Sequence, residues 1–389
     1  MRQMYDYIVI GQGLTGMLSA IWARERGASV ALISQGEGRI IQSTGVMDLI
    51  PGDRGNIIKM LEEYNINSWD DFTIKNGIDK FKSLLNRLDY PYHGNIYNPV
   101  EIITGSGHLK STGLYPETIQ PIIQPIPEKG HIMIIGFREI ADFQPKYIKG
   151  NLSKDRPELK ISTMNISLGK RSLRTMTQLD AARMLEDQEN RKYVLKQIKE
   201  QLKVQSAHSI NLFVFPSALG ILEWKVIIEE LKEELQAPVT EAVGMPPNAA
   251  AIRLYEVLKK EMIRLGVRLY SNTQVIGSKV ENDILKSIKI KNSISGELKA
   301  KKYVIAAGGI IGGGLEQTAK GLKEKVLGIE INQNGEYLST IKNVYLVGAS
   351  QGMHVIRNGI TGGVFSILSS YTAIKQAVKE DTAYDQYVG

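Results

Sequence analysis

The chain has 389 residues, 43% of them hydrophobic and 23% charged, which is ordinary for a soluble globular protein with room for two domains. It contains no cysteine, which excludes disulfides and any zinc or iron–sulfur centre held by cysteines of this chain. The formal net charge is +7, but the basic residues alternate with glutamate in helical stretches such as 191–203 and 253–268. We therefore interpret these stretches as solvated helix faces and not as a nucleic-acid site.

The chain begins with an apolar strand that runs directly into a glycine-rich turn, IVIGQGLTG (8–16). In this order Gly11 allows the tight turn, Gly13 lets a phosphate approach the backbone, and Gly16 lets the next helix pack against the strand. A helix is predicted over 14–26 and a second strand over 29–34. The free N–H groups of the first helical turn would then face an anion.

An expected acidic residue is missing from this fingerprint. Dinucleotide-binding proteins usually carry an Asp or Glu at the end of the second strand, about twenty residues after the turn, to bind the ribose hydroxyls. Here residues 34–36 read Ser-Gln-Gly, and Glu37 comes late. Two interpretations stay open: Ser34, Gln35 or the backbone holds an adenosine ribose, or the cofactor is a mononucleotide without adenosine.

The middle of the chain has a different character. Residues 53–88 have the apolar spacing of an amphipathic helix, and 90–130 are rich in proline with short β-like pieces. A strand is predicted over 131–136, helical structure over 176–202, and a further apolar strand over 210–215.

From Pro247 onward the pattern returns to that of the first region. The predicted elements are a helix over 248–265, a strand over 267–271, a β-meander over 274–299, apolar strands over 302–307 and 344–347, and a last helix over 362–378. Arg253 on the first of these helices is interpreted as solvated.

Two further glycine clusters follow apolar strands in the last region: AAGG (306–309), and GAS (348–350) with NGITGG (358–363) before the last helix. A second helix N-terminus at this place suits a flavin, because negative charge grows at the N1/C2=O end of the reduced ring.

We therefore predict an α/β protein in which a Rossmann-like flavin-binding domain with a β-meander is assembled from both chain ends, with an inserted α+β cap domain. The predicted boundaries are 1–88 and 247–389 for the flavin-binding domain and 89–246 for the cap, to which 311–340 could contribute.

The order of these elements resembles that of the two-domain flavoproteins of the fumarate reductase and succinate dehydrogenase type. Within that group the chain resembles the B subunit of the anaerobic glycerol-3-phosphate dehydrogenases over essentially its whole length. The residues that carry the resemblance are IVIGQGLTGMLSA (8–20), STGVMDLI (43–50), ADFQ (141–144), MPPNAAAIRL (245–254), YVIAAGGIIGGGLE (303–316) and NVYLVGASQG…GITGG (343–363).

The resemblance implies that Ser43, Thr44 and Gly45 line the flavin ring and that 359–363 face its pyrimidine edge. It also implies FMN, with FAD as the alternative, and no metal. Gly348-Ala349 stands where the wider group has Gly-Asp or Gly-Glu, so a carboxylate for the ribityl chain is absent. The predicted cofactor-binding residues are Gly11, Gly13, Leu14, Thr15, Gly16, Ser34, Gln35, Ser43, Thr44, Gly45, Ala307, Gly308, Gly309, Gly348, Ala349, Asn358, Gly359, Thr361, Gly362 and Gly363.

His354 and Arg357 resemble the substrate ligands of fumarate reductases. If the chain turns over a substrate of its own, Arg357 would bind the anion and His354 would carry a proton; otherwise both line the site or an interface without chemistry. His93, His108 and His131 are interpreted as surface or interface residues, because no metal-ligand spacing links the histidines.

The resemblance implies a flavoprotein subunit that relays electrons from glycerol 3-phosphate oxidation toward quinone. Its implied partners are the catalytic A subunit, which contains FAD, and an iron–sulfur subunit that anchors the complex in the membrane. No apolar run reaches the roughly 18 residues of a membrane span, and the N-terminus reads as a strand and not as a signal peptide. We expect a cytoplasmic protein, held at the inner face of the cell membrane through a partner. The alternatives are an independent FAD-dependent oxidoreductase of the fumarate reductase or aspartate oxidase kind, and a flavin-free structural subunit.

Overall fold

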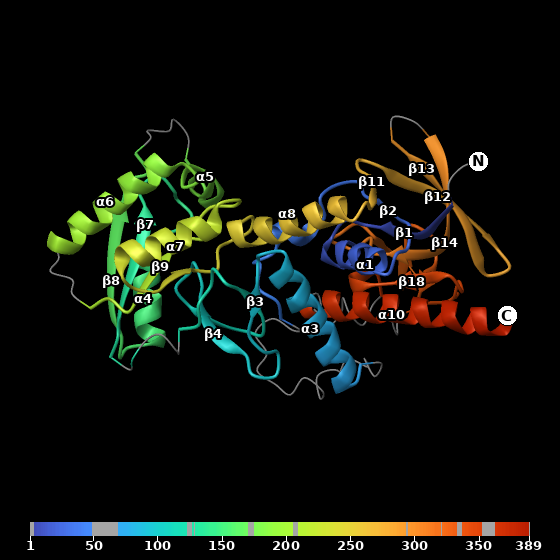
Figure 1. Ribbon diagram of the computed structural model, residues 1–389, viewed down its shortest axis with the longest axis horizontal. Helices are drawn as coiled ribbons and strands as arrows, with labels where there is room; N and C mark the ends of the chain where they lie inside the picture. The colour runs from blue at the N-terminus through green and yellow to red at the C-terminus, as the bar shows by residue number, and fades with distance from the viewer. Residues whose placement is uncertain are drawn as a thin grey trace.

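The computed structural model describes residues 4–48, 69–122, 127, 129–169, 175–204, 209–292, 295–319, 321–332, 337–351 and 362–388. Two sheets lie at opposite ends of an elongated molecule, and helix α8 (Ala249–Arg264) runs between them (Figure 1). Both chain termini lie at the end that carries the first sheet (Figure 1).

The first sheet takes strands from both ends of the chain. Its order is β11-β2-β1-β14-β13-β12, and β18 also pairs with β14. The strands are β1 (Met4–Ile10), β2 (Val30–Ile33), β11 (Arg268–Tyr270), β12 (Gln274–Glu281), β13 (Ile284–Lys291), β14 (Ser295–Ile305) and β18 (Val344–Leu346). β14 combines two patterns, because its first half pairs antiparallel with β13 and its second half lies parallel to β18. The predicted meander is therefore the antiparallel part of this sheet, formed by β12, β13 and the first half of β14, and the other strands are parallel.

Apolar residues explain how this sheet is covered. Residues 8–10 of β1 and the whole of β2 are buried, as expected for parallel strands with helices on their faces. Helix α1 (Leu14–Arg24) packs against α10 (Gly363–Val388), and α10 packs against α3 (Asp71–Arg87). Asp70 caps α3 by accepting a hydrogen bond from the backbone N–H of Thr73 at 2.7 Å. Of the predicted helix over 53–88, residues 53–68 lie outside the described residues.

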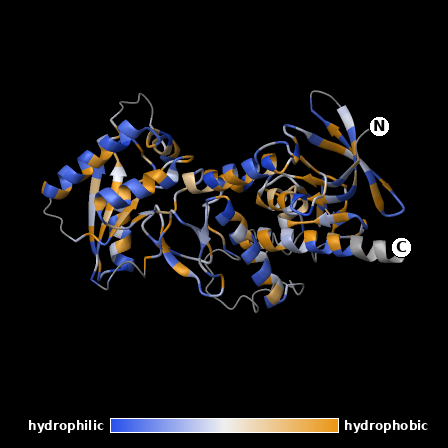
Figure 2. Ribbon diagram, in the orientation of Figure 1, coloured by the Kyte–Doolittle hydropathy of each residue, from blue (hydrophilic) through white to orange (hydrophobic). Residues whose placement is uncertain are grey.

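The second sheet is parallel throughout, with the order β10-β9-β7-β8. Its elements are β7 (His131–Phe137), α4 (Pro145–Asp155), β8 (Lys160–Ile166), α5 (Gln178–Met184), α6 (Gln188–Val204), β9 (Leu212–Phe215), α7 (Trp224–Leu235) and β10 (Val239–Glu241). Figure 2 shows hydrophobic residues along its strands and mixed helices over them. We expected an α+β arrangement here, but strands and helices alternate, which is the α/β pattern. β8 and the three-residue β10 carry too weak an apolar signal to be predicted.

Short elements complete the fold. They are β3 (Tyr92–His93), β4 (Val100–Ile103), β5 (Leu109–Thr112) and β6 (Tyr115–Pro116) between the sheets, β15 (Leu315–Thr318), β16 (Gly321–Glu324) and β17 (Glu330–Ile331) after β14, and the 3-10 turns η1 (Arg39–Gln42) and η2 (Gly348–Gln351). In the part of the chain that the structure describes, no helix has both the length and the apolar character needed to cross a membrane.

Candidate functional site

The glycine turn between β1 and α1 has the geometry that its sequence predicts. A Cβ added at Gly11, where φ is +113°, would lie 2.1 Å from the carbonyl oxygen of Ala306, and one added at Gly16 would lie 1.9 Å from the carbonyl oxygen of Gly11. These two glycines are therefore required by packing. Gly13, the N-cap of α1, has no atom within 4 Å of its Cβ direction and no side-chain cap. The first turn of α1 thus has space beside it for an anion.

The end of β2, where a ribose-binding acid would stand, is occupied by a buried hydrogen-bond chain. The Ser34 hydroxyl donates to Gln12 Oε1 at 2.7 Å, and Gln12 Nε2 donates to the Tyr255 hydroxyl at 3.0 Å. Burial raises the pKa of Tyr255, and the negative charge of Glu37 raises it further. Glu37 also lies 4.0 Å from Lys259 Nζ. Ser34 is therefore committed to Gln12, whereas Gln35 is exposed.

The carboxyl ends of β1, β14 and β18 meet around the start of α1. At the end of β14, the Gly308 N–H donates to Ser350 Oγ at 3.1 Å. After β18, a Cβ added at Gly348 would lie 2.6 Å from Thr15 Oγ1. The structure therefore brings together the predicted residues of the turn (Gly11–Gly16), of 307–309 and of 348–349, although they come from opposite ends of the chain.

Residues 47 and 48 lie against the start of α10. The backbone of Met47 pairs with Leu114, and the Asp48 carbonyl accepts the N–H of Val364 at 3.2 Å. A Cβ added at Gly363 would lie 1.9 Å from Met47 Sδ, so the first residue of α10 is packed closely against Met47. The predicted Gly363 thus lies beside the residues that directly follow the predicted Ser43, Thr44 and Gly45 in the chain.

Two residues beside the predicted site, Asp48 and Gly38, were not predicted from the sequence. The Asp48 carboxylate accepts hydrogen bonds from Lys110 Nζ, from the Thr112 hydroxyl at 2.6 Å and from the Gly113 N–H at 3.1 Å. A Cβ added at Gly38 would lie 2.7 Å from the Gly13 nitrogen, so the loop after β2 lies against the glycine turn. The run SQGEG (34–38) signals a close backbone approach at Gly38, but nothing local indicates the partners of Asp48.

The structure corrects the interpretation of Arg253 as solvated. Its side chain is fully buried, as is that of Glu241 on β10, and the two form a bidentate ion pair with distances of 2.6 and 2.9 Å. Burial acts to lower the pKa of Arg253, but the Glu241 charge outweighs it and raises that pKa. The pair joins α8 to the second sheet.

The histidines divide into two kinds. His93 and His108 are half exposed and lie 3.6 and 3.4 Å from Glu117 and Asp155, as expected for surface residues. The interpretation of His131 as a surface or interface residue is wrong: it is buried within the chain at the start of β7, and its Nε2 lies 2.9 Å from Ser162 Oγ.

Several predicted residues lie outside the part of the chain that the structure describes. The two candidate catalytic residues, His354 and Arg357, lie outside the described residues, as do Asn358, Gly359 and Thr361. Across the described ranges, no group of three or more histidine, aspartate or glutamate side chains could hold a metal ion.

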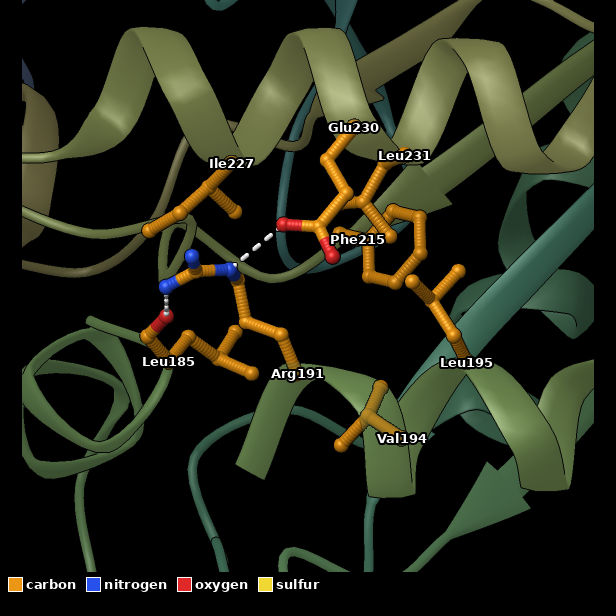
Figure 3. Close-up of a pocket in the computed structure, with 8 residues that line it drawn as sticks. All are labelled: Leu185, Arg191, Val194, Leu195, Phe215, Ile227, Glu230 and Leu231. Carbon is orange, nitrogen blue, oxygen red and sulfur yellow. Dashed lines mark hydrogen bonds and ion pairs between the residues drawn. The ribbon is translucent and has the colours of Figure 1, made fainter. Parts of the chain in front are cut away.

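Two cavities lie away from the glycine clusters. One of about 730 Å³ opens at the amino-terminal edge of the first sheet, beside Tyr5, Arg268 and Tyr270. The other, of about 10 Å³, lies between α6 and α7, where Arg191 Nε donates to Glu230 at 2.7 Å and its guanidinium also binds the Leu185 carbonyl (Figure 3). The smaller cavity is at the lower limit for one water molecule.

Comparison with known proteins identifies the class of this protein. Residues 6–361 match the FAD binding domain family, and the chain belongs to that family. This membership, together with the open approach to Gly13, supports a flavin cofactor. Mixed parallel and antiparallel pairing in one flavin-binding sheet agrees with the predicted α/β class.

The relatives are more specific. The chain is 26% identical to the B subunit of anaerobic glycerol-3-phosphate dehydrogenase from Vibrio cholerae over 358 residues, which cover 85% of this chain and 79% of that protein. It is 26% identical to the same subunit from Aliivibrio fischeri in an alignment of 427 positions, gaps included, which covers 95% of this chain and 90% of that protein. The resemblance to the B subunit is thereby confirmed.

A solved structure is similar at a much greater distance. The 3-ketosteroid Δ1-dehydrogenase from Sterolibacterium denitrificans matches with 14% identity and a TM-score of 0.35 over 79% of this chain. The match spans about half of that enzyme, 48% of its chain, and at this score it supports no further argument.

Proposed function

We propose that this chain is the flavoprotein subunit of an anaerobic-type glycerol-3-phosphate dehydrogenase. It would relay electrons from the oxidation of glycerol 3-phosphate to dihydroxyacetone phosphate toward quinone. The observation that carries the proposal is the meeting of the open Gly13 turn with the ends of β14 and β18. The related B subunits belong to anaerobic glycerol-3-phosphate dehydrogenases, which supplies the substrate and the class of reaction.

The proposed cofactor is FMN. The buried chain from Ser34 through Gln12 to Tyr255 occupies the end of β2, where a ribose-binding acid would stand. Among the described residues 34–38 the carboxylate belongs to Glu37, which is exposed and lies four residues beyond the end of β2, whereas one phosphate needs only the backbone of the glycine turn. These observations favour a mononucleotide over FAD.

Each part of the site has a proposed role. The N–H groups at Gly13–Gly16 would bind the phosphate, and 43–45, 307–309 and 348–349 would enclose the ring. The start of α10 at 362–363, with the adjoining 358–361, would place the positive end of a helix dipole at the pyrimidine edge, which favours negative charge there. A bound flavin supplies the capacity to accept two electrons and release them one at a time.

The remaining roles concern the assembly. We propose the domain division 1–88, 89–246 and 247–389, a catalytic FAD-containing subunit and an iron–sulfur membrane-anchor subunit as partners, and a peripheral position at the membrane through them. The B-subunit name of the relatives supports a complex of several subunits. If the chain has a substrate of its own, Arg357 would bind its anion and His354 would act as a hydrogen-bond donor or proton carrier.

The test begins with the purified chain, alone and with its partner subunits. We expect flavin absorbance near 450 nm, release of FMN by acid as identified by chromatography, and reduction of the flavin by glycerol 3-phosphate only when the catalytic subunit is present. Release of FAD by the isolated chain would overturn the cofactor proposal. The proposed function would be overturned if the isolated chain is colourless and the intact complex releases no FMN beside the FAD of its catalytic subunit, or if the isolated chain reduces a dicarboxylate.

A further inference from the structure

The loop expected to line the flavin ring is attached to the first turn of α8. Asn248, the N-cap of this helix, is completely buried. Its side-chain oxygen accepts the N–H of Ala251 at 3.1 Å, and its side-chain nitrogen donates to the Ser43 carbonyl at 2.9 Å. One side chain therefore both starts the helix and holds a loop that lies 205 residues earlier in the chain.

Only an amide side chain performs both tasks. Asp, Ser, Thr and Asn all accept a hydrogen bond at an N-cap. Asparagine also carries two N–H donors in fixed geometry beside its acceptor. Asn248 uses this second group on Ser43 and, at 3.4 Å, on the Gly244 carbonyl. The cap by itself would not select asparagine here, but the bond to Ser43 does.

The rest of the loop is held in contact with the same helix turn. A Cβ added at Gly45 would lie 2.8 Å from Ala250 Cβ, so backbone and helix touch directly. The Tyr92 hydroxyl donates to the Gly45 carbonyl at 2.6 Å, and the Tyr90 hydroxyl donates to the Ala250 carbonyl at 3.1 Å. The position of residues 43–45 is thus determined by α8: Gly45 packs against Ala250, and Asn248 donates a hydrogen bond to Ser43.

We propose that Asn248 is a positioning residue for the flavin ring: its amide fixes the Ser43 carbonyl, and through it the loop 43–45, against the start of α8. This inference rests on the proposed function in one respect, namely that 43–45 line the ring. The attachment of the loop to α8 does not depend on any cofactor.

Two substitutions separate the donor from the cap. In Asn248→Ser the hydroxyl still caps α8 but cannot reach Ser43 as the amide does, and in Asn248→Asp the cap remains while an acceptor faces the Ser43 carbonyl. Asp70→Ala removes the cap of α3 and leaves the loop untouched, so it is the matched control for a general loss of stability. Flavin affinity by fluorescence quenching and the visible spectrum are compared with the midpoint of urea unfolding.

We expect both Asn248 variants to bind FMN about ten-fold more weakly, with a shifted flavin spectrum, since the half-buried Ser43 carbonyl has lost its donor. Asp70→Ala should unfold at a lower urea concentration yet keep its flavin affinity. Hydrogen exchange of 43–48 in the flavin-free chain should be faster in Asn248→Ser than in the wild type and in Asp70→Ala.

Unchanged affinity, spectrum and exchange in the Asn248 variants would overturn this inference alone. The inference would also be overturned if flavin affinity fell in proportion to the loss of stability in all three variants, Asp70→Ala included. If the wild-type chain binds no flavin of its own, alone or beside the FAD of the catalytic subunit, the proposed function fails, and with it the role toward the ring; the exchange measurement then tests the attachment separately.

Discussion

The ion pair between Arg253 on α8 and Glu241 on β10 offers a direct test of how the two sheets are joined. Both side chains are fully buried, and the guanidinium also donates to the Gly220 carbonyl at 2.8 and 2.5 Å and to Thr118 Oγ1 at 3.2 Å. The substitution Arg253→Met keeps an unbranched side chain at this place and removes every donor. Glu241 would keep the backbone N–H of Leu219, at 2.8 Å, and lose both guanidinium bonds.

The expected cost follows from the burial. Removing one partner of a buried ion pair costs about 3–5 kcal/mol, because the other charge is left uncompensated. That is a large share of the roughly 5–15 kcal/mol by which folded domains are stable. In the double variant Arg253→Met/Glu241→Leu no charge remains, so we expect it to be more stable than Arg253→Met alone, although the Gly220 carbonyl has lost its donors.

Urea unfolding followed by tryptophan fluorescence measures this cost. Trp224 is a suitable reporter because its ring centroid lies 5.4 Å from that of Tyr90, and both rings are buried. Lys279→Met is the surface control: Lys279 and Glu281 form an exposed pair at 2.8 Å, and its loss should cost no more than about 1 kcal/mol. A loss below about 1 kcal/mol in Arg253→Met, or a double variant less stable than the single one, would refute the reasoning.

Further predictions concern the glycine turn and the acid limit of stability. Gly13→Ala should fold normally, because open space surrounds its Cβ direction, yet bind flavin at least about ten-fold more weakly, since the methyl group obstructs the phosphate. Gly16→Ala should lose about 3 kcal/mol or more in urea unfolding, because its Cβ would lie 1.9 Å from the Gly11 carbonyl oxygen; equal unfolding midpoints for the two variants would contradict both expectations. Burial alone would raise the pKa of Asp6, but hydrogen bonds from Lys301 and the Ser29 backbone outweigh it and lower the pKa to about 2 from 3.8. This contribution to stability is complete above about pH 4 and is lost as the pH falls toward 2, so Asp6→Asn should flatten the acid limb by about 1 kcal/mol or less, given the partial exposure; identical acid limbs would disprove it.

Local chemistry explains which features the sequence revealed. The turn at 11–16 could be predicted because a strand, three glycines and a helix follow one another within about twenty residues, and packing requires glycine at Gly11 and Gly16. The meander and the last strands were predictable for the same reason, since their periodicity and turns are contained in neighbouring residues.

Long-range contacts explain what was missed. Arg253 reads as a solvated cation on a helix because its partner Glu241 is on another element, and the periodicity of α8 does not reveal that both become buried. His131 was misjudged in the same way, since a histidine before an apolar strand gives no sign that Ser162 lies beside it. The all-parallel second sheet was not predicted because β10 has only three residues and is recognisable as a strand only through its pairing with β9.

By itself, the amino-acid sequence determined the Rossmann-like turn and the flavoprotein class, because these depend on residues close together in the chain. The assembly of the sheet from both chain ends was indicated by a strand-and-glycine pattern that returns after Pro247. The tertiary structure alone decided how Ser34 is used, how Asp48 is paired and how Asn248 reaches Ser43. Each of these depends on a hydrogen-bond partner at least 22 positions away, and no pattern within a single segment indicates such a partner.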